Sequence, residues 1–343
     1  MKKFSFLLLG VMCFVSTYSQ KTVVLESNGT TNVFDGTSPF VQAYETAVDG
    51  DIIYLPGGSF KPPALIDKNI SIIGAGHYPS TVTGITPTVI SAPLVIGENA
   101  SGLFLEGMDF GNYNIEFTDD KAINDVIVSR CKFYQLLYNG TGTSKAINNT
   151  IKGCVITNEI YLTNTSGTTL SNSLVYGRIY FGSGNFIKNN IIMYERANSG
   201  SNYSPISQLS NCTISGNIFL KDYNGYIQYE CQSCTFSNNI FASNPPVGNN
   251  TFENNYNSID LSTLFVNQSG NTFNYDHDYH LSGSNASIYI GTDDTQVGIF
   301  GGLFPYKEHA IPSNPQITSK SIAASTDDNG MLNVNITVEA QDN

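Results

Sequence analysis

A short sequence motif recurs along residues 108–257 and limits the folds that this chain can adopt. Each copy centres on an Asn-type residue, defined here as position zero, with apolar residues three before it and two after it. Ile187-Lys-Asn-Asn190-Ile-Ile192 and Ile214-Ser-Gly-Asn217-Ile-Phe219 are two examples. Position zero falls at 108, 131, 154, 173, 190, 217, 239 and 255. A period of roughly 20 residues in strand-forming segments predicts a β-solenoid.

Alternation along a strand sorts these positions into inward and outward rows. Positions zero and two share one face, and position one points to the other. Position two is apolar and is predicted to form the core. An inward Asn at position zero suits a corner, because its amide can bond backbone groups of both neighbouring coils. We expect a structural ladder of Asn190, Asn217, Asn239 and Asn255, with a polar channel or ligand contact as the alternative.

Position one predicts an outward apolar row across successive coils. An exposed row of this extent normally has a cover or a partner. Either the C-terminal hairpin or a loop lies along it, or it docks another protein. This row, called the outward stripe, consists of Val155, Leu174, Ile191, Ile218, Ile240 and Tyr256.

The chain divides into three parts. Residues 1–19 combine a basic start, a short apolar run and a small-residue cleavage site, which is typical of a signal peptide. Residues 20–305 hold the repeats. In residues 306–343 a linker precedes alternating apolar and polar residues around Val334 and Ile336, which predicts a short β-hairpin. We therefore expect export to the periplasm, the cell surface or the medium of a bacterium, and no transmembrane segment.

The net charge of the chain limits the classes of partner that we expect. The chain has 28 acidic and 16 basic residues, a formal net charge of −12. Such a chain should avoid nucleic acid and anionic membranes, and should on average repel polyanionic glycans. Neutral glycans, cations or an envelope protein are the partners that this balance favours.

The opening segment carries a family resemblance. Ser38-Pro39 begins a short predicted helix with Phe40, Tyr44 and Ala47 on one face, suited to capping an open core. Asp49-Gly-Asp-Ile-Ile-Tyr-Leu-Pro-Gly-Gly58 and Ile70-Ser-Ile-Ile-Gly-Ala-Gly76 follow. Together these segments resemble the first coils of secreted proteins of the pectate-lyase-like superfamily.

The resemblance implies a fold rather than an activity. It covers roughly residues 22–303 and implies an all-β, single-stranded right-handed parallel β-helix with an N-terminal capping helix. Lyases, hydrolases and proteins without known chemistry share this fold, so it specifies no reaction.

Candidate catalytic residues are few. A lyase on this fold needs a base and a cation that neutralises a substrate carboxylate. Arg130 and Lys132 flank Cys131 and are expected near Asp109, one coil earlier, although each is also a plausible solvated charge. Paired carboxylates at matching repeat positions are absent, which disfavours a glycoside hydrolase.

Two further groups are candidate binding residues. Asp276, Asp278 and His280 share one face of a predicted strand and could bind a metal, although the resemblance makes this segment a structural closing coil. No cofactor is predicted; Ca²⁺ is the one ion considered, and no Asp pair has the spaced ligands of a calcium loop. Tyr194 and Tyr203 are candidates for stacking on sugars, an idea that the absence of Trp weakens.

The cysteines fall at matching positions of adjacent coils. Stacked strands lie about 4.7–4.9 Å apart, within the Cα separation that a disulfide requires. Cys131–Cys154 and Cys212–Cys234 are therefore possible disulfides, with buried free thiols as the alternative.

These observations leave three hypotheses about function. The first is a non-catalytic exported protein that binds a glycan or a protein partner along its lateral face. The second is a polysaccharide lyase or glycoside hydrolase of the same superfamily. The third is a structural subunit of an envelope complex.

Overall fold

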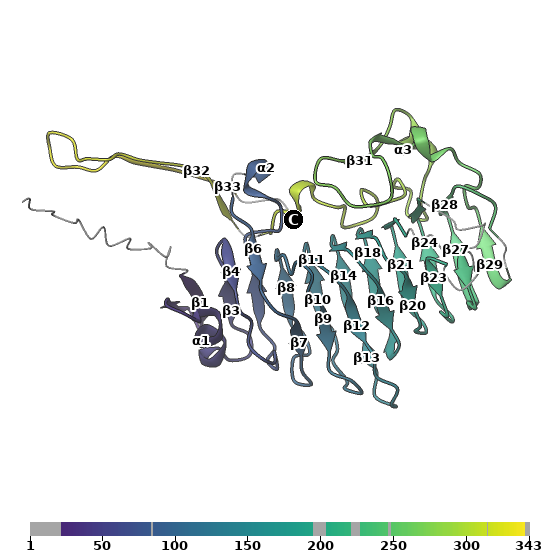
Figure 1. Cartoon of the computed structure of the whole chain (residues 1–343), viewed down its shortest axis with the longest axis horizontal. Helices are drawn as coiled ribbons and strands as arrows, with labels where there is room; N and C mark the ends of the chain where they lie inside the picture. The colour runs from purple at the N-terminus through teal and green to yellow at the C-terminus, as the bar shows by residue number, and fades with distance from the viewer. Residues whose placement is uncertain are drawn as a thin grey trace, which may run out of the picture.

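The computed structural model describes residues 22–83, 85–194, 204–220, 227–245, 248–313 and 315–339. The chain winds into a stack of coils whose strands form three long sheets (Figure 1). From β3 onward all strand pairs within these sheets are parallel and join successive coils. The fold is a parallel β-helix, as the repeat predicts.

The three sheets form the walls of the stack. The twelve-stranded sheet, in spatial order, contains β2 (Thr30–Phe34), β1 (Val23–Ser27), β3 (Ile52–Tyr54), β5 (Ser71–Ile73), β8 (Phe104–Glu106), β10 (Ile127–Ser129), β14 (Thr150–Lys152), β18 (Thr169–Ser171), β21 (Phe186–Lys188), β24 (Thr213–Ser215), β27 (Gln232–Ser237) and β29 (Asn249–Glu253). The six-stranded sheet contains β11 (Lys132–Phe133), β15 (Val155–Ile156), β19 (Leu174–Val175), β22 (Ile191–Ile192), β25 (Ile218–Phe219) and β28 (Ile240–Phe241). The seven-stranded sheet contains β26 (Gln228–Tyr229), β23 (Ile206–Ser207), β20 (Ile179–Tyr180), β16 (Ile160–Leu162), β12 (Leu136–Tyr138), β9 (Ile115–Phe117) and β7 (Leu94–Ile96).

Shorter elements complete the coils. Two-stranded sheets pair β4 (Gly58–Phe60) with β6 (Thr88–Ile90), β13 (Ala146–Ile147) with β17 (Thr165–Ser166), β30 (Phe265–Asn267) with β31 (Asp278–Leu281), and β32 (Gln316–Ile322) with β33 (Val334–Glu339). The short helices are α2 (Ser80–Thr83), η2 (Leu261–Thr263), α3 (Asn285–Ile288) and η3 (Glu308–Ala310). No helix among the described residues is long and apolar enough to cross a membrane.

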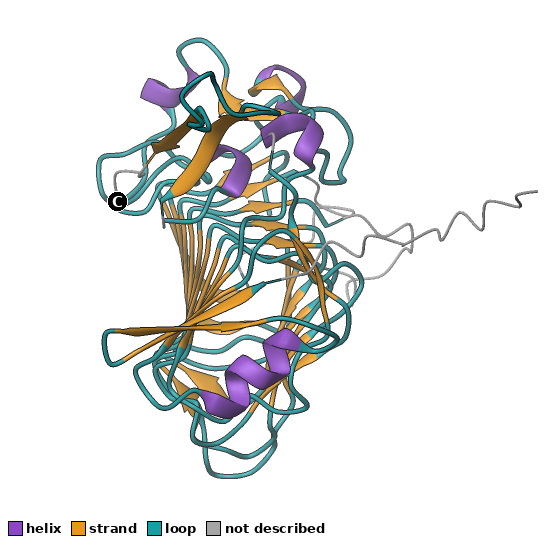
Figure 2. Cartoon of the chain, turned by 90° about the vertical axis from the view of Figure 1, so that its left-hand side faces the viewer, coloured by secondary structure: helices purple, strands orange, loops and turns teal. Residues whose placement is uncertain are grey.

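Helix α1 (Pro39–Thr46) closes the first end of the stack, as predicted. It lies across the open end of the coils (Figure 2) and buries Phe40, Ala43 and Tyr44 against the core. Ser38 occupies the N-cap position, with Pro39 in the first turn. The Lys68 ammonium donates to the carbonyls of Tyr44 and Ala47 at 2.7 and 2.6 Å. These bonds satisfy carbonyls that the last helical turn leaves unpaired.

The Asn ladder runs through the interior of the stack. Asn190, Asn217 and Asn239 are fully buried. Each side-chain oxygen accepts hydrogen bonds from the preceding coil, and each side-chain nitrogen donates both to the next Asn in the ladder and to a backbone carbonyl. Asn255 ends the ladder with a bond to the carbonyl of Phe236. The predicted structural role of position zero is therefore confirmed.

Residues 259–310, called here the cover, lie over the outward stripe. The structure buries Val155, Leu174, Ile191, Ile218 and Ile240, each at most 1% exposed. They form a second apolar core with cover residues that include Leu264, Leu281 and Ile299. The position-one row is thus outward as expected, but the hypothesis that it docks another protein is wrong, because its side chains are already packed. The covering segment is the loop alternative and not the C-terminal hairpin.

Close packing holds the cover in place. Gly298 has φ +82°, and an added Cβ there would lie 2.6 Å from Cδ1 of Ile218. Its backbone amide donates to the carbonyl of Gly216 at 2.7 Å. A side chain at this position would therefore push the cover away from the stripe.

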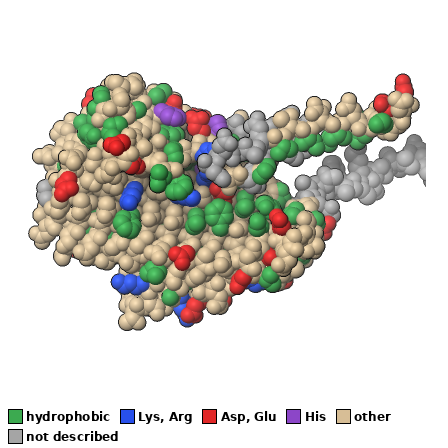
Figure 3. Space-filling model, turned by 180° about the vertical axis from the view of Figure 1, so that it is seen from behind, with side chains coloured by type: hydrophobic (Ala, Val, Ile, Leu, Met, Phe, Trp, Pro, Cys, Tyr) green, Lys and Arg blue, Asp and Glu red, His purple; other side chains and the backbone are tan. Residues whose placement is uncertain are grey.

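The predicted C-terminal hairpin consists of β32 and β33. It projects from the body with hydrophobic side chains along one edge (Figure 3). Val334, Ile336 and Val338 are each about half exposed. Within the described residues these two strands pair only with each other.

Candidate functional site

Residues with a left-handed backbone conformation stack in a column at the corner between the twelve- and six-stranded sheets. At position minus one, φ is +61° in Gly153, +49° in Asn172 and +65° in Gly216. Gly and Asn adopt this conformation at little cost, whereas other residues pay roughly 1–2 kcal/mol. Arg130 is the exception in this column, with φ +49°. A costly residue at a position that favours Gly or Asn is a sign of function.

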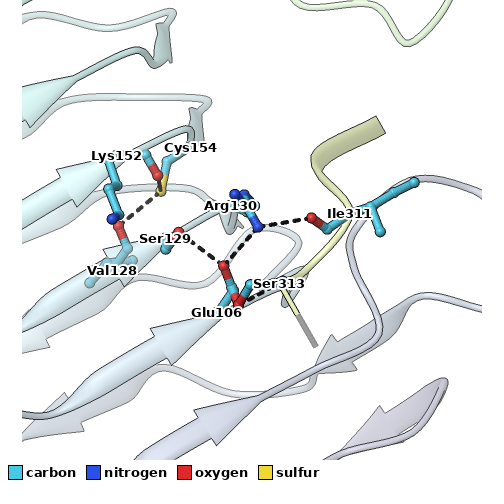
Figure 4. Close-up of polar contacts among 8 residues, drawn as sticks. All are labelled: Glu106, Val128, Ser129, Arg130, Lys152, Cys154, Ile311 and Ser313. Atoms are coloured by element: carbon cyan, nitrogen blue, oxygen red, sulfur yellow. Dashed lines mark hydrogen bonds and ion pairs between the residues drawn. The ribbon is translucent and has the colours of Figure 1, made fainter. Parts of the chain in front are cut away.

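The Arg130 side chain belongs to a polar cluster at the end of β8 and β10 (Figure 4). Its Nη1 donates to Oε1 of Glu106 at 3.2 Å and to the carbonyl of Ile311 at 3.1 Å. Glu106 is 2% exposed, and its Oε2 accepts hydrogen bonds from the backbone amide and hydroxyl of Ser313. The buried carboxylate therefore ties residues 311–313 to the coils. Since both Arg130 contacts use Nη1, the other guanidinium donors can serve a ligand.

Three cations meet at a cavity beside this cluster. Arg130 and Lys152 reach it from successive coils, since Ser129 and Lys152 are paired neighbours of β10 and β14. Lys307 and the ring of Phe304 come from the cover. The cavity has a volume of about 310 Å³ and is lined by Ser129, Arg130, Lys152, Gly153, Leu303, Phe304, Pro305, Tyr306 and Lys307.

Apolar groups shape the electrostatics of the cavity. The Lys152 ammonium lies 4.4 Å from the centroid of the Phe304 ring. Burial lowers the pKa of Lys152 below its usual value, and the positive charge of Arg130 acts in the same direction. The Glu106 carboxylate, which is paired with Arg130, acts in the opposite direction, and an anion entering the cavity would further stabilise the charged form of both cations. Phe304, which is 61% exposed, offers an accessible apolar surface at the same place.

The other candidate catalytic residues lie apart from this cavity. Lys132 bridges to Asp109, with Nζ 3.1 Å from Oδ2, and both side chains are largely buried. Lys132 also lies 5.7 Å from the ring centroid of Tyr275 in the cover. The structure thus brings Lys132 and Asp109 together as expected, but pairs Arg130 with Glu106 instead.

Of the two candidate tyrosines, the structure describes only Tyr194. Tyr194 is 6% exposed and lies 6.0 Å from the Arg178 guanidinium, so it is not available to stack on a sugar. Tyr203 lies outside the described residues.

The predicted cysteine pairs are stacked but not bonded. Cys131, Cys154, Cys212, Cys231 and Cys234 are buried free thiols, so Cys131–Cys154 and Cys212–Cys234 are not disulfides in this structure. Consecutive parallel strands hold paired Cβ atoms near the 4.8 Å strand spacing, which exceeds the usual 3.5–4.5 Å of a disulfide.

The acidic segment of the cover does not form a metal centre in the structure. His280 Nδ1 lies 2.7 Å from Oδ1 of Asp278, and its ring stacks on Phe300 at 3.8 Å. The backbone amide of Asp276 donates to Oδ1 of Asn274 at 3.0 Å. No group of three or more His, Cys, Asp or Glu in the described parts of the chain is placed to hold a metal ion. Asp278 and His280 thus pair with each other within the cover, and metal binding by Asp276, Asp278 and His280 stays a prediction.

Sequence reasoning missed the half of the cavity that the cover supplies. Leu303, Phe304 and Lys307 lie outside the repeat, and no spacing rule connects them to Arg130 and Lys152. The one available signal was Arg130 itself, at a position where other coils carry Gly or Asn.

Comparison with known proteins identifies no relative of this chain. No protein-family model, no curated protein and no solved structure matches this chain. Its place among the parallel β-solenoids therefore rests on its own three stacked sheets.

Proposed function

We propose that this chain is an exported β-helix protein that binds an acidic saccharide through the cavity at Arg130, Lys152 and Lys307. The convergence of three cations on one cavity, in a chain of net charge −12, is the observation that carries the proposal. A carboxylate is the expected anion, because a guanidinium binds it with two parallel hydrogen bonds.

The apolar wall favours a sugar as the carrier of that carboxylate. Phe304 and Leu303 are 61% and 89% exposed and border the cations. Sugar rings present C–H faces that pack on aromatic rings, while their carboxylates bond to the adjacent charges. The likeness of the opening coil to the pectate-lyase-like superfamily supports the same ligand class.

Titration calorimetry tests this proposal. Oligogalacturonates should bind, and neutral oligosaccharides of equal length should bind much more weakly. Affinity should fall with added salt, because exposed charges are screened. Arg130→Asn keeps a residue suited to the left-handed corner and removes the cation, so we expect at least about tenfold weaker binding.

Lys188 provides a matched control. It occupies the same register as Lys152, two coils further along the twelve-stranded sheet, but does not line the cavity. Lys188→Gln should bind as the wild type does, whereas Lys152→Gln should bind weakly. Equal affinities for acidic and neutral sugars, or equal losses in the two Lys variants, would contradict the proposal.

A lyase is the second candidate, and Lys152 is the observation that favours it. A lysine whose pKa is lowered by burial can act as a general base, with Arg130 neutralising the substrate carboxylate. Incubation with polyuronates should then produce the ultraviolet absorbance of an unsaturated uronate, and Lys152→Gln should abolish it. Binding without this product supports the non-catalytic function.

A further inference from the structure

The C-terminal hairpin has open strand edges and an exposed apolar face. Strands β32 and β33 pair with each other and with no other strand of the described chain. Ile322, Val334, Ile336 and Val338 are between 49% and 56% exposed, and the hairpin stands clear of the coils (Figure 1). A lone two-stranded hairpin is only marginally stable in water, whereas three or more strands with an apolar face form a stable sheet. A further strand would therefore stabilise this hairpin.

The two edges of the hairpin differ in their protection against pairing. Strand β32 contains Lys320, and a register shift leaves Thr318 without an opposite residue on β33. Lysines and bulges of this kind keep natural edge strands from pairing with other chains. Strand β33, which runs without interruption from Val334 to Glu339, contains no Lys, Pro or bulge. The open edge of β33 is thus the one suited to bind another strand.

The apolar and polar residues of β33 follow an order that is symmetric about Ile336. Opposite residues of an antiparallel pair point to the same face of the sheet. A two-fold axis at Ile336 therefore sets this residue opposite itself, and Val334 opposite Val338 of a second copy. The polar pairs that result, neither of which joins two like charges, are Asn335 with Thr337 and Asn333 with Glu339. Strand β33 is thus complementary to its own antiparallel copy.

Strand β32 lacks this symmetry. The same operation about Ser319, its central residue, sets Ile317 opposite Ser321 and Ile322 opposite Gln316. Each of these pairs joins an apolar residue to a polar one, which gives up the cross-strand contact between apolar side chains that stabilises a sheet. Self-pairing is therefore a property of β33 alone.

An apolar hollow lies at the root of the hairpin. It has a volume of about 360 Å³, and the residues that line it include Val24, Leu55, Pro312 and Pro315. Hydrophobic side chains also gather on the body next to the root of the hairpin in the space-filling view (Figure 3). The hollow therefore offers an apolar binding surface directly beside the hairpin.

The tip of the hairpin is complementary to this hollow. Met331 and Leu332, near the tip, are 65% and 49% exposed. In the two-fold register, they lie opposite the positions that follow Glu339 of the second copy, at the root of its hairpin. The tip of each hairpin thus reaches the hollow of the other copy, and the same contact forms twice.

We propose that this chain forms a two-fold symmetric dimer in which the β33 strands pair about Ile336 and each hairpin tip enters the hollow of the other copy. A second copy is the expected partner because one chain carries both halves of each contact, the strand with its reverse and the tip with the hollow. The saccharide cavity and the hollow share no lining residue. The dimer is therefore independent of the proposed binding function.

Sedimentation equilibrium of the full-length protein tests the proposal. We expect the mass of two chains, with a dimer fraction that rises with protein concentration. Ile336→Lys would set two ammonium groups opposite each other on the axis and should raise the dissociation constant at least about tenfold. Ile322→Lys is the matched control, because Ile322 lies opposite Val334 on the same face but in the strand remote from the second copy. This variant should remain a dimer.

Two further variants test the arrangement of the strands and of the tip. Ile336→Cys should give a covalent dimer with a short bismaleimide, seen on a denaturing gel. Ile322→Cys should not, because three strand spacings, roughly 14 Å or more, would separate its two thiols. The wild type, whose described cysteines are buried, is the control. Met331→Asp should also weaken the dimer by placing a charge in the apolar hollow.

Several outcomes would overturn the proposal. A monomeric mass at every concentration would exclude the dimer. Equal weakening by Ile336→Lys and Ile322→Lys, or equal cross-linking at the two positions, would exclude pairing of the β33 strands. An unchanged dissociation constant in Met331→Asp would exclude the contact between the tip and the hollow.

Discussion

The side-chain oxygen of Asn217 accepts two hydrogen bonds from Asn190, one from the backbone amide and one from the side-chain nitrogen, each 2.9 Å long. Asn217 also donates to the carbonyl of Ile187 at 2.8 Å. Asn217→Ala would leave these buried groups of the preceding coil unpaired. Each unpaired buried group costs roughly 1–3 kcal/mol.

We therefore expect Asn217→Ala to lower the free energy of unfolding by at least about 2 kcal/mol, measured by urea denaturation. Asn255→Ala is the control, because Asn255 is only half-buried at the end of the ladder and water can replace its bonds. Equal losses in the two variants would show that burial of the ladder does not set its contribution.

A charge in the outward stripe should detach the cover. Leu174 is 1% exposed, and Leu174→Asp would bury a carboxylate with no partner in the second core. We expect a lower midpoint of thermal unfolding and rapid proteolysis within residues 259–310. Leu137→Asp, on the outer and partly exposed face of β12, is the matched control and should be tolerated.

The fully buried His77 should make the protein sensitive to acid. Burial lowers the pKa of His77 to about 3, below its value of 6.5 in the unfolded chain. The unfolded state therefore binds the proton more readily, and stability falls as pH decreases below 6.5. The slope from this residue is at most about 1.4 kcal/mol per pH unit.

Replacing His77 separates its contribution from that of the carboxylates. The stability of His77→Phe should fall less steeply between pH 6.5 and pH 4 than that of the wild type, as followed by urea denaturation at each pH. Parallel curves for the two proteins would mean that His77 does not titrate on unfolding.

Removal of the hairpin should leave the body folded. Strands β32 and β33 pair only with each other in the described residues, and their apolar side chains are half exposed. A chain ending at Pro315 should keep the thermal midpoint of the full-length protein within about 2 °C. A chain ending at Asn257 lacks the cover, exposes the outward stripe and should aggregate. Similar behaviour of the two truncations would contradict this division.

The sequence predicts the stack well because its information is periodic. Asn217 lies in its ladder and Ile218 in its outward row by strand alternation alone, so a single register places every coil. The left-handed corner also has a local signal, because Gly153 and Asn172 at position minus one are residue types that favour a positive φ. The spacing of the repeat does not by itself predict that conformation.

The cavity could not be predicted in the same way. Phe304 and Lys307 return to Arg130 after more than 170 residues of chain, through packing of the cover and not through any repeat. Net charge pointed away from anionic ligands because it averages over the whole surface, whereas binding depends on the few charges at one place.

The cover also changes how unfolding can proceed. In an ordinary solenoid each repeat contacts only its neighbours, so the array can fray from one end in small steps. Here Tyr306 contacts Tyr78 in an early coil, while Tyr289 packs on Tyr256 in the last one. The cover is thus one continuous segment that contacts both an early coil and the last coil. Opening a single coil beneath it would also break the contacts of that coil with the cover. The protein should unfold as a single cooperative unit, and during synthesis it acquires that cooperativity only after the cover, which follows the last coil in the sequence, has been made.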